Sequence, residues 1–110
     1  MLDIQGLWSL KSLRSPEEGA QPASGYLRYG HDGWMNVVLM KGLPPSHEFW
    51  TSYTGTYQLY GDYVEHYPQL GFSPNGLGPK KRYVRRQKHQ LILSTSPEGK
   101  GTVLEFEQHP

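Results

Sequence analysis

Residues 25–40 read GYLRYGHDGWMNVVLM, and this segment indicates how the rest of the chain folds. Two runs in which apolar and polar residues alternate flank the dipeptide Asp32-Gly33. An Asp-Gly pair between alternating runs is the strongest short-range signal for a β-hairpin, because Gly adopts the positive φ that a tight turn requires. We therefore predict two antiparallel strands joined at this turn.

The same alternation recurs along the chain. A first strand is predicted at residues 6–13, and further alternating runs joined by short turns occupy residues 53–60 and 63–67, 81–87 and 90–95, and 102–108. Successive hairpins form an antiparallel meander, and about eight strands is the number that closes into a small barrel without free sheet edges. The predicted fold is all-β, a small antiparallel up-and-down barrel.

Three segments interrupt the alternation. Residues 14–24 form a Pro-, Gly- and Ser-rich connection that is too polar for the core. In residues 46–51, Ser46 is the expected N-cap of a short helical turn. Residues 68–79 are expected to form a long loop because they contain three prolines and three glycines. The last two segments are both candidates to cover a barrel end.

The composition indicates one domain that spans residues 1–110, since 110 residues with 35% hydrophobic content are enough for one modest core. The chain has no cysteine, which excludes disulfides and thiolate metal sites. Neither a secretory signal nor 18 consecutive apolar residues is present, so we expect no membrane partner and a cytoplasmic location. A net charge of +1 gives no general preference for nucleic acids.

Strand alternation also predicts which side chains point into the barrel, because successive residues face opposite sides of a sheet. Three polar residues are expected on the inner face and are the candidate catalytic groups, namely His66, Tyr57 and Arg82. The expected apolar and aromatic lining of a ligand site comprises Trp8, Tyr29, Met35, Val37, Tyr53, Val64, Val84, Leu93 and Phe106. An apolar interior with a few converging polar groups is typical of a small-molecule site.

The three polar residues point to acid–base chemistry. Histidine titrates at about pH 6.5 and serves as a general acid or base, so His66 with Tyr57 and Tyr29 would form a proton-transfer group. Arg82, or Arg86 on the same face, would bind a carboxylate or enolate oxygen of a ligand through charge-assisted hydrogen bonds. The alternative is that His66 is a hydrogen-bonded core residue and that the tyrosines only pack.

Other kinds of site find little support. The five histidines show no His-x-His pair and no pair at helical spacing, so we expect no metal and no cofactor. The basic run at residues 80–86 contains Tyr83, a mixture found in single-stranded nucleic-acid binders, but on a strand its side chains point to both faces, so we expect no nucleic-acid partner. Outward-facing Tyr26, Trp34, Val38 and Ile92 leave a homodimer open.

Several motifs together resemble the lipocalin-like domain family of small calycin-type barrels. They are GLWSL at residues 6–10, GYLRY at 25–29 followed by Asp32-Gly33, YTGTY at 53–57, VEH at 64–66, and Arg82 ahead of LILST at 91–95. The resemblance covers nearly the whole chain. It implies that Trp8 closes the barrel floor under an arginine from a late strand, here Arg82, through a cation–π contact. Some members of the family are cofactor-free enzymes of natural-product pathways.

Two functions are compatible with these observations. The first is a cofactor-independent cyclase, isomerase or dehydratase that acts on a hydrophobic biosynthetic intermediate by acid–base and shape catalysis inside the barrel. The alternative is a carrier that binds a small hydrophobic ligand without turnover. Replacement of His66 would distinguish the two functions, because only the enzyme would lose turnover while keeping its affinity.

Overall fold

A computed structural model describes residues 3–42 and 48–109, and most of these residues lie in strands. The strands are β1 (Gly6–Ser15), β2 (Gly19–Gln21), β3 (Ala23–Tyr29), β4 (Trp34–Lys41), β5 (Glu48–Tyr60), β6 (Tyr63–Phe72), β7 (Lys80–Gln87), β8 (Gln90–Ser96) and β9 (Lys100–Gln108). The one helical element in these two ranges is a 3-10 turn, η1, at Pro97–Gly99.

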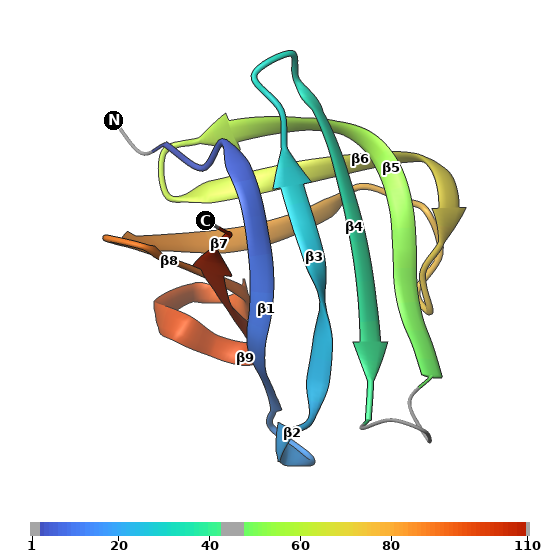
Figure 1. Ribbon diagram of the computed structural model, residues 1–110, viewed down its shortest axis with the longest axis vertical. Helices are drawn as coiled ribbons and strands as arrows, with labels where there is room; N and C mark the ends of the chain where they lie inside the picture. Colours follow the sequence, from blue (N-terminus) through green and yellow to red (C-terminus); the bar gives the residue numbers. More distant parts are fainter. Residues whose placement is uncertain (1–2, 43–47, 110) are drawn as a thin grey trace.

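Eight of the strands form a closed antiparallel barrel (Figure 1). They follow the order β1-β3-β4-β5-β6-β7-β8-β9, and β9 returns to pair with β1 along Trp8 to Arg14. The short strand β2 pairs only with the end of β1 and lies outside the ring of eight. The predicted all-β antiparallel barrel is therefore confirmed.

The β3–β4 hairpin has the turn that its sequence predicts. The Gly30 amide donates to the Trp34 carbonyl at 2.8 Å, and the Trp34 amide donates to the Asp32 carboxylate at 3.1 Å. Gly33 has a φ of +87°, a conformation that disfavours side chains with a Cβ. The register that results places Leu27 opposite Val37, so both side chains point into the barrel.

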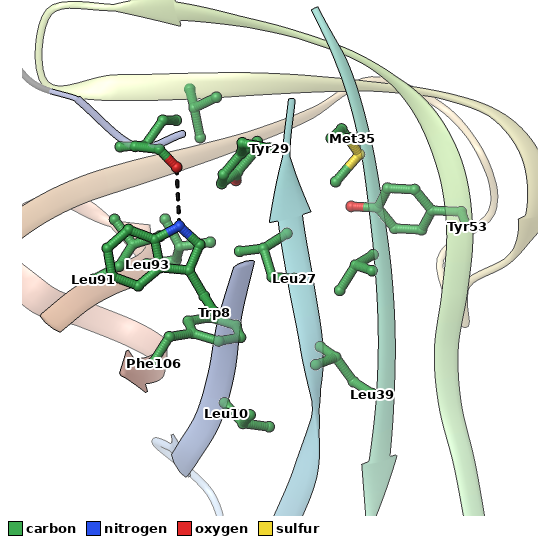
Figure 2. Packing of buried hydrophobic residues seen from close by; sticks show 13 residues of the cluster. Trp8, Leu10, Leu27, Tyr29, Met35, Leu39, Tyr53, Leu91, Leu93 and Phe106 are labelled. Atoms are coloured by element: carbon green, nitrogen blue, oxygen red, sulfur yellow. Dashed lines mark hydrogen bonds between the residues drawn. The ribbon is translucent and has the colours of Figure 1, made fainter. Parts of the chain in front are cut away.

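The core consists of the alternate side chains that point inward from the strands (Figure 2). Trp8, Leu91 and Phe106 pack in its interior, and each is at most 1% exposed. Leu13 is also buried, although the alternation from Trp8 and Leu10 would place it outside. A bulge between Leu10 and Ser12 adds one residue to β1 and turns Leu13 to the inner face.

Two predictions of local structure were wrong in part. The helical turn expected at 46–51 is absent at residues 48–51, because β5 begins at Glu48 and pairs with the end of β4; residues 46 and 47 lie outside the described residues. The loop expected at 68–79 is shorter, because β6 continues to Phe72 in pairing with β5. In both places hydrogen bonding to a neighbouring strand overrides the local sequence preference.

The outer face carries several large apolar side chains. Tyr26, Trp34 and Val38 are exposed on β3 and β4, and Leu70 and Phe72 are exposed near the end of β6. No helix among the described residues has the length and apolar character needed to cross a membrane.

Candidate ligand cavity

A cavity of about 120 Å³ lies inside the barrel. Its apolar wall includes Leu27, Val37, Leu39, Leu93, Leu104 and Phe106, and its polar wall includes Tyr53, His66, Lys80 and Arg82. The exposed residues Pro74 and Thr95 also border it. The cavity therefore reaches the surface at the barrel end that carries the β6–β7 connection and η1.

The opposite end of the barrel is closed around Trp8. The Trp8 indole Nε1 donates to the Ile4 carbonyl at 2.9 Å, the hydrogen bond drawn in Figure 2. The guanidinium of Arg86 lies 4.8 Å from the centre of the Trp8 ring, and Arg86 Nε donates to the Asp3 carbonyl at 3.1 Å. The predicted contact between Trp8 and Arg82 is therefore wrong. Arg82 lies four residues before Arg86 on β7, which is roughly 13 Å from Arg86 along the strand.

His66 sits at the centre of a buried hydrogen-bonded group that we call the Tyr29–His66–Tyr53 chain. Tyr29 Oη lies 2.5 Å from His66 Nε2, and Tyr53 Oη lies 2.7 Å from His66 Nδ1. Tyr29 comes from β3, Tyr53 from β5 and His66 from β6, so the group is assembled across four neighbouring strands of the curved sheet, β3 to β6. Tyr53 projects inward from β5 in Figure 2 and borders the cavity, whereas Tyr29 does not border it.

Burial controls the protonation of this chain. Loss of water around His66 lowers its pKa from 6.5 to about 3, and the positive charges of Arg82 and Lys80 act in the same direction. Burial raises the pKa of Tyr53 to about 12, although the Arg82 charge opposes this shift. Burial also raises the pKa of Tyr29 well above its usual value of 10. All three side chains are therefore neutral at pH 7.

Tyr57 does not take the place that was expected for it beside His66. Although Tyr57 and His66 are opposite each other in the β5–β6 register, the Tyr57 hydroxyl donates to the Gly30 carbonyl at 2.6 Å. Its ring packs against Tyr29 with ring centres 4.7 Å apart and does not border the cavity. Tyr53, which was expected only as lining, occupies the position beside His66 instead.

Two cationic side chains border the cavity. Arg82 donates from Nη1 to the Lys81 carbonyl at 2.8 Å, and Lys80 donates from Nζ to the Gly76 carbonyl at 2.8 Å. Lys80 is only 9% exposed. Burial lowers its pKa, and so does the nearby Arg82 charge. Sequence reasoning missed Lys80, although an extension of the alternation by one step from Arg82 would have placed it on the inner face.

The expected site residues divide into two sets. Val37, Tyr53, His66, Arg82, Leu93 and Phe106 border the cavity; Trp8, Tyr29, Met35, Tyr57, Val64 and Val84 do not. The second set packs into the core or against its edge. The alternation rule did not identify several further residues that border the cavity, because they lie near strand ends, where alternation is weakest. They are Trp50, Thr51, Ser73, Thr95 and Thr102.

Within residues 3–42 and 48–109 no group of three or more His, Asp or Glu side chains is placed to hold a metal ion. Comparison of the chain with family models, curated proteins and solved structures finds no match. The resemblance to the lipocalin-like family therefore stays a prediction, and the function has to be argued from the cavity.

Proposed function

We propose that the protein binds a small, mostly apolar molecule inside the barrel. The observation that carries this proposal is the cavity itself, in which an apolar wall faces one cluster of polar groups. Its volume of about 120 Å³ is close to that of an engineered 150 Å³ cavity that binds benzene. The enclosed part of the ligand is then the size of one aromatic ring, and any remainder would extend through the open end.

The polar groups support a binding role because they are unfavourable in an empty core. Burial of a histidine and a lysine costs free energy that apolar residues of similar volume would not cost. His66 is 4% exposed and Lys80 is 9% exposed, and both border the cavity. Side chains of this kind inside a small barrel serve a ligand better than they serve stability.

The test is an NMR titration of the ¹⁵N-labelled protein with toluene and with benzyl alcohol. We expect saturable shifts that centre on cavity residues such as Val37 and Leu93. Val37→Phe fills the cavity and should abolish binding, whereas Val38→Phe adds the same ring to the outer face of β4 and should leave binding unchanged. Shifts that centre on the exposed Tyr26 and Trp34, or saturation that survives in Val37→Phe, would contradict the proposal.

A second candidate is the cofactor-independent cyclase, isomerase or dehydratase expected from the sequence. It is favoured by one observation, that Tyr53 borders the cavity while it is hydrogen-bonded to His66. A proton could pass along the Tyr29–His66–Tyr53 chain. The pKa values argue against this enzyme. A general acid or base is most effective when its pKa is near neutral, whereas the pKa is about 3 for His66 and about 12 for Tyr53.

Ligand binding is therefore the better supported of the two functions. The two are separated once a ligand is known, by its conversion to product with wild-type protein and with His66→Gln. Turnover that disappears in His66→Gln while the affinity stays within a few-fold would establish the enzyme. Recovery of unchanged ligand from the wild-type protein would exclude it for that ligand.

A further inference from the structure

We propose that the ligand is a small apolar carboxylate, whose carboxylate is held by the Arg82 guanidinium, the Lys80 ammonium and the Tyr53 hydroxyl. This inference rests on the binding function proposed above and adds the chemical class of the ligand. It follows from the hydrogen-bond donors that the polar wall of the cavity offers to a ligand.

The first step fixes the proton between Tyr29 and His66. Tyr29 is 1% exposed, and among the described residues its hydroxyl has only His66 Nε2 as a hydrogen-bond partner. If Nε2 carried the proton, the Tyr29 O–H would be buried with no acceptor, which is costly. Tyr29 therefore donates to Nε2. A neutral imidazole carries one N–H, and because Nε2 accepts from Tyr29, the hydrogen of His66 is on Nδ1.

The second step follows the proton into the cavity. Because Nδ1 carries the hydrogen, His66 donates to Tyr53 Oη across the distance of 2.7 Å. The Tyr53 oxygen is then an acceptor toward His66, and its own O–H is left for another partner. Tyr53 borders the cavity, so this O–H is available to a ligand atom that accepts a hydrogen bond.

The third step concerns charge. Neither Lys80 nor Arg82 lies within 4.0 Å of a carboxylate among the described residues, and no Asp or Glu whose side chain the structure describes borders the cavity. Each cation bonds one backbone carbonyl, which leaves further N–H donors on both groups. Two of the three threonines at the border are already engaged, because Thr51 donates to the Phe72 carbonyl and Thr95 accepts from the Thr102 amide. The polar wall thus offers positive charge and donors, and the ligand has to supply negative charge and acceptors.

A carboxylate fits this wall better than a phosphate. A guanidinium binds a planar carboxylate through two parallel hydrogen bonds, and the Tyr53 hydroxyl adds one more donor. The remaining wall is formed largely by leucines and Phe106, which suits an alkyl or phenyl group. A phosphate brings more charge and a third acceptor oxygen to be satisfied in the same small space.

The experiment compares benzoate with benzyl alcohol, and hexanoate with hexanol, by calorimetry and NMR at pH 7 on the whole chain. Charged hydrogen bonds of this kind correspond to a preference of about ten- to a hundred-fold, and we expect the carboxylates to bind more tightly by this factor. Arg82→Gln should remove most of the preference and leave benzyl alcohol within about two-fold. Arg85→Gln removes the same charge from the exposed face of β7 and should change neither affinity.

Tyr53→Phe provides an independent test, because it removes the one hydroxyl hydrogen assigned to the ligand. It should weaken benzoate binding by several-fold, roughly the value of one hydrogen bond. Long-range ¹H–¹⁵N NMR of the wild-type protein should show His66 protonated at Nδ1, a readout that does not depend on binding. Protonation at Nε2 would overturn the assigned direction of the chain and the role of Tyr53.

The other outcomes separate the two proposals. Equal binding of benzoate and benzyl alcohol would overturn the carboxylate inference and leave the binding function standing. Tighter binding of phenyl phosphate than of benzoate would replace the carboxylate with a different anion class. An equal loss of benzoate affinity in Arg82→Gln and Arg85→Gln would show that only the net charge of the protein matters, and it would overturn the role of Arg82. Absence of binding for every probe would overturn the binding function and the inference with it.

Discussion

The surroundings of His66 favour its neutral form. Both of its ring nitrogens are hydrogen-bonded to tyrosines, and it is almost fully buried. The two neighbouring cations, Arg82 and Lys80, make a positive charge on the imidazole still less favourable. A histidine held in this way acts near neutral pH as an uncharged, oriented hydrogen-bond group rather than as a pH-dependent charge.

The first residue-scale prediction concerns stability against acid. Because the pKa of His66 is about 3 in the folded protein and about 6.5 unfolded, the unfolded state binds more protons between these values. The free energy of unfolding should therefore fall as the pH drops through this window, by roughly 2 kcal/mol between pH 7 and pH 5. Urea denaturation at the two pH values measures this change.

The matched variants for this measurement are His66→Gln and His31→Gln. His66→Gln should be less stable at pH 7 and should lack most of the fall at pH 5. His31 is exposed at the β3–β4 turn, so His31→Gln should keep the wild-type fall. A fall that persists in His66→Gln would show that another group is responsible.

At the scale of the element, β5 is the strand that shapes the cavity. It runs for 13 residues from Glu48 to Tyr60, and Trp50, Thr51 and Tyr53 in its first half border the cavity. Figure 1 shows β5 as a curved ribbon. The β5–β6 register shifts between Thr54 and Gly55, where β6 contains one extra residue, Gln69. The backbone of β6 comes so close to Gly55 that an added Cβ would overlap the Tyr67 carbonyl oxygen.

This close approach predicts the effect of Gly55→Ala. The added methyl group has to push β6 away at the bulge, and overpacking of this kind typically costs about 1–3 kcal/mol. Thermal and chemical denaturation would show the loss. Gly78→Ala is the matched control, because no atom lies within 4 Å of a Cβ at Gly78, and it should leave stability unchanged or slightly raised. Equal stability of the two variants would mean that β6 yields without cost.

At the scale of the whole molecule, the barrel is closed but not equally paired around its circumference. Trp8 in β1 pairs with both β3 and β9, and Leu27 in β3 pairs with both β1 and β4. By contrast, β2 pairs only with β1, and in β6 only Tyr63–His66 pair with β7. The remainder of β6, residues 67–72, has a strand on one side and carries the exposed Leu70 and Phe72.

This uneven pairing predicts the order of amide hydrogen exchange. Amides of Trp8 and Leu27 should exchange slowly, whereas those of β2 and those in residues 67–72 that point away from β5 should exchange quickly. NMR exchange measured at low and high protein concentration tests this order. Strong protection of residues 67–72 only at high concentration would show that a second copy covers this edge, and protection at every concentration would contradict the predicted order.

The sequence by itself determined the inward faces of most strands and the approximate positions of all but β2, although not the start of β5 or the end of β6. The Asp32-Gly33 turn and the alternation on either side of it are local properties, and a strand keeps its alternation wherever it lies. The inner positions of Val37, His66 and Leu93 follow from this rule alone. The rule was weakest at bulges and strand ends. It did not predict the burial of Leu13, which follows a bulge, or the residues at strand ends that border the cavity.

Only the tertiary structure decided which inward side chains meet. The stagger and tilt of strands in a closed barrel set the height of each residue along the axis, and no single strand encodes them. For this reason Tyr53 rather than Tyr57 bonds to His66, and Arg86 rather than Arg82 covers Trp8. The size of the cavity was decided in the same way, since it is the space left between side chains of seven strands, β3 to β9.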